Sequence, residues 1–323
     1  MYNYSKNFLD RMAAETGFIR DQLEKVFRLC DILQFLNTHS TTAGCLSLKG
    51  GTAINLTIFN LPRLSVDIDL DFSEECNRDE MMNARANIND DILNFMFAQG
   101  YAISPNTKNP HSLDSWVFYF QNAGGNKDNV KIEINYSLRC HVLPIVRKSV
   151  NAAFLQVTGE WTTLSTLELF GGKIKALIER TAPRDLYDVQ NMIKHHVIAS
   201  EEQDLLRKIV IFYLVLGSGK RIELPFRFDH IEILKYHQIR AHLNPVLRKS
   251  ERFDFETAKI EVKEYLSQLM MLTGNERLFI EKFNNGIYQP ELLFDDDDMI
   301  KRIQEHPMAI WKTEIASKTI TKP

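Results

Sequence analysis

The sequence of 323 residues has little cysteine, no long apolar run and almost no net charge. Its four cysteines are too few for a disulfide scaffold, and no pair has the C-x-x-C spacing of a zinc site. No apolar stretch reaches membrane-spanning length and the N-terminus lacks the apolar segment of a signal peptide, so we expect a cytoplasmic protein that contacts no membrane. The 39 basic and 42 acidic residues give a net charge of −3, which argues against a protein that coats nucleic acid by charge alone.

The composition is that of a globular protein, with 44% hydrophobic and 25% charged residues over a length typical of two domains. Residues 6–37 and 77–98 follow the helical period, whereas 101–160 is rich in β-branched and aromatic residues around a Gly-Gly-Asn turn. Helical patterns dominate after that. We therefore expect an α+β fold in two parts, residues 1–160 with the strands and 161–323 as a mainly helical domain.

The segment VDIDLDF, residues 66–72, alternates strictly between apolar and acidic residues, which is the period of a β-strand. That period places Asp67, Asp69 and Asp71 on one face and the apolar side chains on the other. Alternate residues lie about 6.6–6.8 Å apart along a strand, so neighbouring carboxylates can converge on shared cations. Oxygen ligands of this kind suit Mg²⁺ or Mn²⁺ rather than zinc. A solvated edge strand is the alternative interpretation.

A glycine loop, Lys49-Gly50-Gly51-Thr52, lies just upstream, between a short apolar stretch and an amphipathic segment. Two glycines at such a turn let the backbone approach a ligand closely, and the start of the following helix offers free N–H groups to a phosphate. A glycine pair alone is often just a turn. Followed by a helix and then a D-x-D strand, it indicates a triphosphate site beside a cation site.

This order of motifs resembles the nucleotidyltransferase superfamily with the polymerase-β-like fold, whose core is a mixed β-sheet. In that superfamily a Gly-Gly or Gly-Ser pair, a short helix and D-h-D are followed by a third carboxylate on a later strand. Here Asp67-Ile68-Asp69 matches D-h-D, and VKIEINY supplies Glu133 as the third carboxylate. The superfamily usually has aspartate there. The alternative interpretation makes Glu133 a surface residue paired with Lys131.

Four ordered segments give a closer resemblance, to the AbiEii/AbiGii toxin family of bacterial abortive-infection and toxin–antitoxin systems. They are LKGGTAINL (48–56), LPRLSVDIDLDF (61–72), VKIEINY (130–136) and GGKIKALIERTAPRDLYDV (171–189). The resemblance implies a metal-dependent enzyme that transfers a nucleoside monophosphate from an NTP to an acceptor. It implies Mg²⁺ or Mn²⁺ as cofactor, tRNA as one acceptor class and a cognate antitoxin as partner.

The family pattern also implies roles for individual residues. It implies catalysis by Asp67, Asp69, Glu133, Lys173 and Asp188, the first three as metal ligands. It implies nucleotide binding by Lys49, Gly50, Gly51, Thr52, Arg184 and Asp185. Three alternatives stay open: Lys175 in place of Lys173, a structural role for Asp185, and a surface ion pair between Arg184 and Asp188.

The small net charge is a sum of unlike parts. Residues 67–91 carry nine acids and two bases, a net of −7, whereas residues 205–252 carry ten bases and four acids, a net of +6. The basic stretch interleaves aromatic residues, which suits an RNA acceptor, although a mixed helical surface explains it as well. An NTP-binding regulatory protein with little transfer, and a structural protein that kept the fold, are the competing functions.

Overall fold

The computed structural model describes residues 4–110, 112–155, 157 and 159–320, and its chain forms two compact units. The first unit is built from residues 4–139, 145–164 and 244–252. The second is built from residues 140–144, 165–243 and 253–320. The predicted division at 160/161 rests on the change from strand to helix patterns, and the last described strand ends at Thr163. Among the described residues, no helix is long and apolar enough to cross a membrane.

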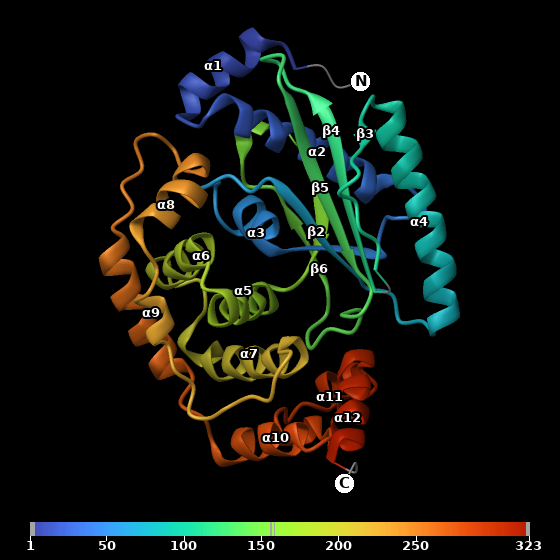
Figure 1. The fold of residues 1–323 in the computed structure, drawn as a ribbon, viewed down its shortest axis with the longest axis vertical. Coiled ribbons are helices and arrows are strands. Elements are labelled where there is room, and N and C mark those ends of the chain that lie inside the picture. The colour runs from blue at the N-terminus through green and yellow to red at the C-terminus, as the bar shows by residue number, and fades with distance from the viewer. Residues whose placement is uncertain (1–3, 111, 156, 158, 321–323) are drawn as a thin grey trace. The chain divides into compact units, whose positions relative to one another are not determined.

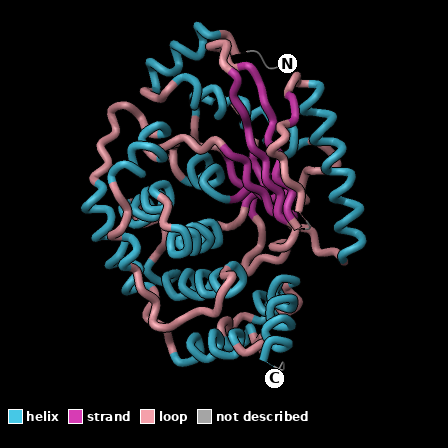
Figure 2. Tube along the Cα trace, viewed as in Figure 1, coloured by secondary structure: helices cyan, strands magenta, loops and turns pink. Residues whose placement is uncertain are grey.

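The first unit is organised around a mixed seven-stranded sheet in the order β3-β4-β5-β2-β1-β7-β6. Its strands are β1 (Leu46–Lys49), β2 (Asp67–Phe72), β3 (Ala102–Ile103), β4 (Leu113–Gln121), β5 (Lys127–Asn135), β6 (Val146–Ser149) and β7 (Glu160–Thr163). The pairs β2–β5 and β1–β7 are parallel, and the other neighbours are antiparallel. Figure 2 shows the strands, in magenta, lying side by side as one sheet. The predicted α+β fold with a mixed sheet is confirmed.

The alternation within β2 sets the two faces of the sheet. Ile68, Leu70 and Phe72 are at most 2% exposed and lie on one face, opposite the acidic side chains. Two helices, α2 (Arg20–Thr38) and α4 (Arg78–Ala98), cover this apolar face (Figure 1). The apolar face therefore carries the core of the unit, and the acidic face is left for polar chemistry.

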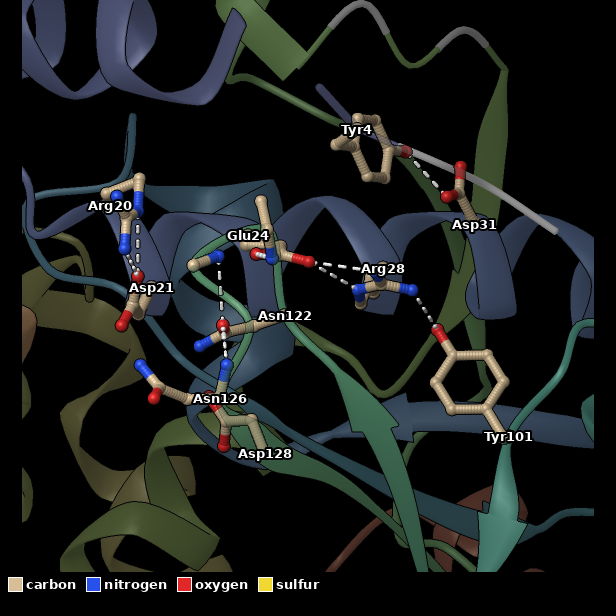
Figure 3. Close-up of polar contacts among 12 residues, drawn as sticks. Tyr4, Arg20, Asp21, Glu24, Arg28, Asp31, Tyr101, Asn122, Asn126 and Asp128 are labelled. Carbon is tan, nitrogen blue, oxygen red and sulfur yellow. Dashed lines mark hydrogen bonds and ion pairs between the residues drawn. The ribbon is translucent and has the colours of Figure 1, made fainter. Parts of the chain in front are cut away.

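A buried ion pair anchors α2 to the β4–β5 hairpin. Glu24 and Arg28 pair at 2.8 Å, and Arg28 also donates to the hydroxyl of Tyr101 at 3.4 Å and lies 4.2 Å from the ring centroid of Phe120 (Figure 3). The other carboxylate oxygen of Glu24 accepts the backbone N–H of Ala123 at 2.8 Å. Since both charges are paired and hydrogen-bonded, their burial is compensated and α2 is held in one register on the hairpin.

The helix expected over residues 6–37 is interrupted, so that prediction is wrong at one point. α1 (Lys6–Thr16) ends where Gly17 adopts a φ of 77° and its N–H bonds to the carbonyl of Ala13. α2 then begins at Arg20. A glycine in the left-handed region at a helix end is a common C-cap, and the apolar period ran through it unchanged.

The second unit consists of helices and loops in its described residues. The helices are α5 (Thr166–Arg180), α6 (Pro183–Lys194), α7 (Gln203–Gly217), α8 (Tyr236–His242), α9 (Phe255–Leu269), α10 (Gly274–Asn284), α11 (Asp297–Ile303) and α12 (Pro307–Ile320). Ser165 caps α5 by accepting the N–H of Glu168. A Cβ on Gly171 would lie 2.5 Å from Ile209 Cγ2, so this glycine is needed for the close approach of α5 to α7.

Candidate active site

The glycine loop of the first unit begins where β1 ends. Gly50 adopts a φ of 68°, which a glycine reaches without strain, and a Cβ at this position would lie 2.6 Å from Asp69 Oδ2. Both the backbone conformation and the space thus require glycine at residue 50. The missing side chain lets the carboxylate of Asp69 lie directly against the loop.

The next two loop residues lie against Arg63 and against the strand that carries the aspartates. A Cβ on Gly51 would lie 2.6 Å from a guanidinium nitrogen of Arg63, which is 2% exposed and donates to the carbonyl of Leu64 at 2.9 Å. Thr52 donates from its hydroxyl to the carbonyl of Asp67 at 2.5 Å. The predicted nucleotide loop is thereby held in a fixed position beside the start of β2.

Strand register brings the predicted metal ligands together. Asp67 pairs with Lys131 and Asp69 with Glu133 across the parallel β2–β5 ladder, and Lys49 pairs with Asp69 across β1–β2. Directly opposed residues of neighbouring strands point to the same face of a sheet. Asp67, Asp69 and Glu133 therefore share the acidic face, as the resemblance to the nucleotidyltransferase superfamily implied.

Two lysines of the same face neutralise part of this charge. Lys49 forms an ion pair with Asp71, which is 2% exposed, and Lys131 pairs with Glu133 at 2.9 Å. The first pair neutralises the charge of Asp71. The second is the pairing that the alternative interpretation of Glu133 foresaw.

The donor set on this face is suited to a divalent cation. Carboxylate oxygens are the ligands that Mg²⁺ and Mn²⁺ prefer, and Asp67 and Asp69 supply them beside the glycine loop. No group of three or more His, Cys, Asp or Glu residues is arranged as a metal cage among the described residues. The arrangement thus fits two aspartate ligands, with Glu133 held by Lys131 next to them.

A second group of predicted residues meets in the second unit. Lys173, on α5, places its ammonium 2.9 Å from Asp185 Oδ1 and 3.1 Å from Asp188 Oδ2, both on α6. The Lys173 side chain is 7% exposed and the two carboxylates are 1% exposed. Lys173 and Asp188, both named as catalytic by the family pattern, are thus in direct contact. The competing lysine, Lys175, instead pairs with Glu179 at 2.7 Å on the same helix.

Arg180 completes this cluster from the end of α5. Its Nε donates to Asp185 Oδ2 at 2.7 Å and its second terminal nitrogen donates to Oδ1 at 3.1 Å, a bidentate geometry. Burial acts to raise the pKa of Asp185, but Lys173 and Arg180 outweigh it and hold that pKa below its usual value. The four residues Lys173, Arg180, Asp185 and Asp188 are called the lysine cluster below.

The α5–α6 turn explains why Arg180 reaches Asp185. Thr181 adopts a φ of 49° and closes α5, and Pro183 then starts α6 at its first position. This sharp reversal places the first turn of α6 beside the last turn of α5. Sequence reasoning missed Arg180, although a helix-terminal arginine followed closely by T-A-P-R-D is a signal that could have found it.

Arg184, the last of the predicted nucleotide-binding residues, lies near α8. Its Nε donates to the carbonyl of His242 at 2.8 Å, in the final turn of that helix. Asp188, its suggested surface partner, is buried in the lysine cluster. The basic stretch 205–252 is also divided, because residues 244–252 belong to the first unit.

Comparison with known proteins fits these two groups of residues. The family described as "Nucleotidyl transferase AbiEii toxin, Type IV TA system" matches residues 32–278. The fold resembles that of MenT4, a nucleotidyltransferase toxin from Mycobacterium tuberculosis H37Rv, with a TM-score of 0.61, 13% identity and coverage of 95% of this chain and 99% of that chain. No curated protein matches the chain. With three quarters of its length matched, the chain belongs to the AbiEii family of nucleotidyltransferase toxins of type IV toxin–antitoxin systems.

Proposed function

We propose that the protein transfers a nucleoside monophosphate from an NTP to the hydroxyl of an RNA acceptor, tRNA being the class that the family suggests. The observation that carries this proposal is the contact of the Gly50 turn with the carboxylate of Asp69, in register with Glu133. A loop that presents backbone N–H groups beside carboxylate oxygens is suited to a triphosphate with its bound cation, because the N–H groups bind the phosphates and the carboxylates bind the cation. Pyrophosphate is the leaving group.

In this proposal Asp67 and Asp69 hold one or two Mg²⁺ or Mn²⁺ ions, and Glu133 assists them near the acceptor hydroxyl. When bound, the metal stabilises the charge on the attacking and leaving oxygens. Gly50, Gly51 and Thr52 position the triphosphate, with Lys49 beside them. We propose that Glu133 also takes the proton of the acceptor hydroxyl, a role supported by the 27% exposure of its side chain.

We propose that Lys173 offsets charge on the phosphates and that Asp188 orients Lys173. Their 3.1 Å contact in a buried setting supports this division of roles, because a fixed ammonium needs no reorganisation when charge develops on the phosphates. Arg184 is proposed to assist nucleotide binding.

An RNA acceptor is supported by the exposed side of α8. Tyr236 is 67% exposed, His237 and Arg240 are exposed beside it, and the helix carries no acidic residue. An exposed aromatic ring next to cations is a typical contact for an unpaired base and its phosphate. By family, we further propose a cognate antitoxin as partner and the cytoplasm, where NTPs and tRNA meet, as the place of action.

Transfer of label from an NTP into RNA tests the proposed function. Purified protein with Mg²⁺, each labelled NTP in turn and total RNA is expected to label RNA and to release pyrophosphate. Asp67→Asn and Asp69→Asn are each expected to lower the rate by about 10²–10³-fold, since each removes a metal ligand. Asp90→Asn, an exposed change on α4, is the matched control.

The outcome also separates the competing functions. Saturable NTP binding without label in RNA would contradict transfer to RNA and favour an NTP-binding regulatory protein. Absence of both binding and transfer would favour a structural role. Growth arrest on expression that Asp69→Asn relieves would support the toxin activity in cells.

A further inference from the structure

Arg180 and Asp185 form a pair whose role the proposed function leaves open. Asp185 accepts bonds from two cations, and its side chain is only 1% exposed, so no part of it is presented to a ligand. Arg180 is the reverse case, because its side chain is 65% exposed although two of its nitrogens are bound to Asp185. One member is sealed in the protein and the other can be reached from solvent.

The charge balance of the lysine cluster depends on Arg180. Lys173 faces two carboxylates, and without Arg180 this group would carry a net charge of −1. Buried carboxylates that lack a counter-charge are costly and would attract the ammonium more strongly to themselves. With Arg180 the cluster holds two positive and two negative charges, and it is neutral.

We propose that Arg180 is a positioning residue that neutralises the charge of Asp185, so that the Lys173 ammonium does not have to compensate both carboxylates and can attract a nucleotide phosphate. The bidentate grip at 2.7 and 3.1 Å occupies both oxygens of Asp185. Asp188 then remains as the counter-ion that orients Lys173. Asp185 is a structural element of this device, and the inference rests on the proposed role of Lys173 in phosphate binding.

Equilibrium binding of NTP to the full-length protein, with Mg²⁺ and without RNA, tests the inference. Arg180→Gln leaves the cluster with a net charge of −1 and is expected to weaken NTP binding about tenfold, the size expected for one partly screened charge. Arg180→Lys keeps the charge and is expected to stay within about threefold of the wild type. Glu179→Gln, on the same exposed turn of α5, is the matched control.

A charge-rescue variant separates this electrostatic role from a merely structural one. Arg180→Gln combined with Asp185→Asn restores neutrality, and it is expected to recover most of the lost NTP affinity. A structural role predicts that the double variant binds no better than Arg180→Gln, because a second bond of the α5–α6 turn has been removed. Thermal unfolding of every variant shows which of them are folded at the temperature of the assay.

The possible outcomes are distinct. Unchanged affinity in Arg180→Gln, or a double variant as weak as the single one, overturns the inference while the proposed function stands. Equal losses in Arg180→Lys and Arg180→Gln overturn it as well. A wild-type protein that binds no NTP under these conditions removes the proposed function, and the inference with it.

Discussion

The acidic face of β2 and the lysine cluster contain similar residues but differ in how far their charges are buried and paired. On the acidic face Asp67 and Asp69 are partly exposed, and the two nearby lysines pair with Asp71 and Glu133. In the lysine cluster each carboxylate is 1% exposed and bound to a cation of the protein. Like charges held close together with room for a ligand favour binding of a cation, whereas buried charges that are paired internally favour a fixed geometry. The acidic face is thus suited to bind a cation, whereas the lysine cluster is suited to hold its charged groups in a fixed geometry.

The largest expected effect comes from breaking the lysine cluster. Lys173→Met leaves two buried carboxylates with Arg180 as their remaining cation in the cluster, and we expect a loss of about 3–5 kcal/mol in the free energy of unfolding. Lys175→Met removes a partly exposed i,i+4 pair on the same helix and should cost less than about 0.5 kcal/mol. Urea unfolding of the two variants measures the difference. Equal costs would show that the burial of the cluster does not govern its energetics.

The next largest effect tests the requirement for glycine beside the acidic face of β2. Gly50→Ala places a Cβ 2.6 Å from Asp69 Oδ2, and the displaced carboxylate should lower the rate of nucleotide transfer about 10–100-fold. Gly125→Ala is the matched control, because Gly125 has a φ of 86° but no atom within 4 Å of the added Cβ. Both variants carry similar backbone strain. A similar loss of transfer in both would mean that strain, and not the contact with Asp69, is responsible.

A smaller effect is expected at Asp31, a carboxylate that lies neither on the acidic face nor in the lysine cluster. Burial raises the pKa of Asp31 from 3.8 to about 6, although Tyr4 and Arg28 act against it. Because this pKa is higher in the folded protein than in the unfolded chain, the free energy of unfolding falls as pH rises from about 4 to 6 and stays lower above that. Asp31→Asn should remove this fall and stabilise the protein by about 1 kcal/mol at pH 7. Urea unfolding between pH 4 and 8 is the measurement, with Asp90→Asn as control.

The smallest effect on stability is expected at the partly exposed ion pair between Lys131 and Glu133 on the acidic face of β2. Lys131→Met should change the free energy of unfolding by less than about 0.5 kcal/mol, because both partners of the pair reach solvent. The same change frees Glu133 and removes a positive charge beside Asp67, so Mn²⁺ should bind several-fold more tightly. Titration with Mn²⁺ alone, followed by electron paramagnetic resonance, measures the affinity. Weaker binding would show that Lys131 supports the cation site.

The sequence predicted the elements that depend on local pattern. The alternation of VDIDLDF placed Asp67 and Asp69 on a strand, and the order of glycine loop, helix and strand identified the nucleotidyltransferase core. The helices of the second unit followed from periodicity, and the mixed sheet was implied by the resemblance to the nucleotidyltransferase superfamily. Local pattern was enough because each of these features is decided within one or two turns or strands.

What the sequence did not reveal are pairs formed between separate segments. The pattern of β2 makes Asp71 equivalent to Asp67, and only the side-chain ion pair between neighbouring strands shows that Lys49 neutralises Asp71, although Lys49 lies opposite Asp69 in the register. The helical period treats Arg180 as a solvated helix end, and only the turn that follows it in T-A-P-R-D points to its partner Asp185. The burial of Arg63 beneath Gly51 likewise depends on tertiary packing. Register and packing choose among residues that the period treats alike.

The excursion of residues 244–252 into the first unit has a consequence for how the protein can be divided. There the N–H of Leu64 bonds to the carbonyl of Val246, and Arg248 donates to the carbonyls of Thr16 and Leu61. A gene fragment that stops after the last strand would lack these partners. We expect such a fragment to expose the segment that leads into the carboxylate strand, so the catalytic core is not a detachable module that could be exchanged between toxins by joining sequences end to end.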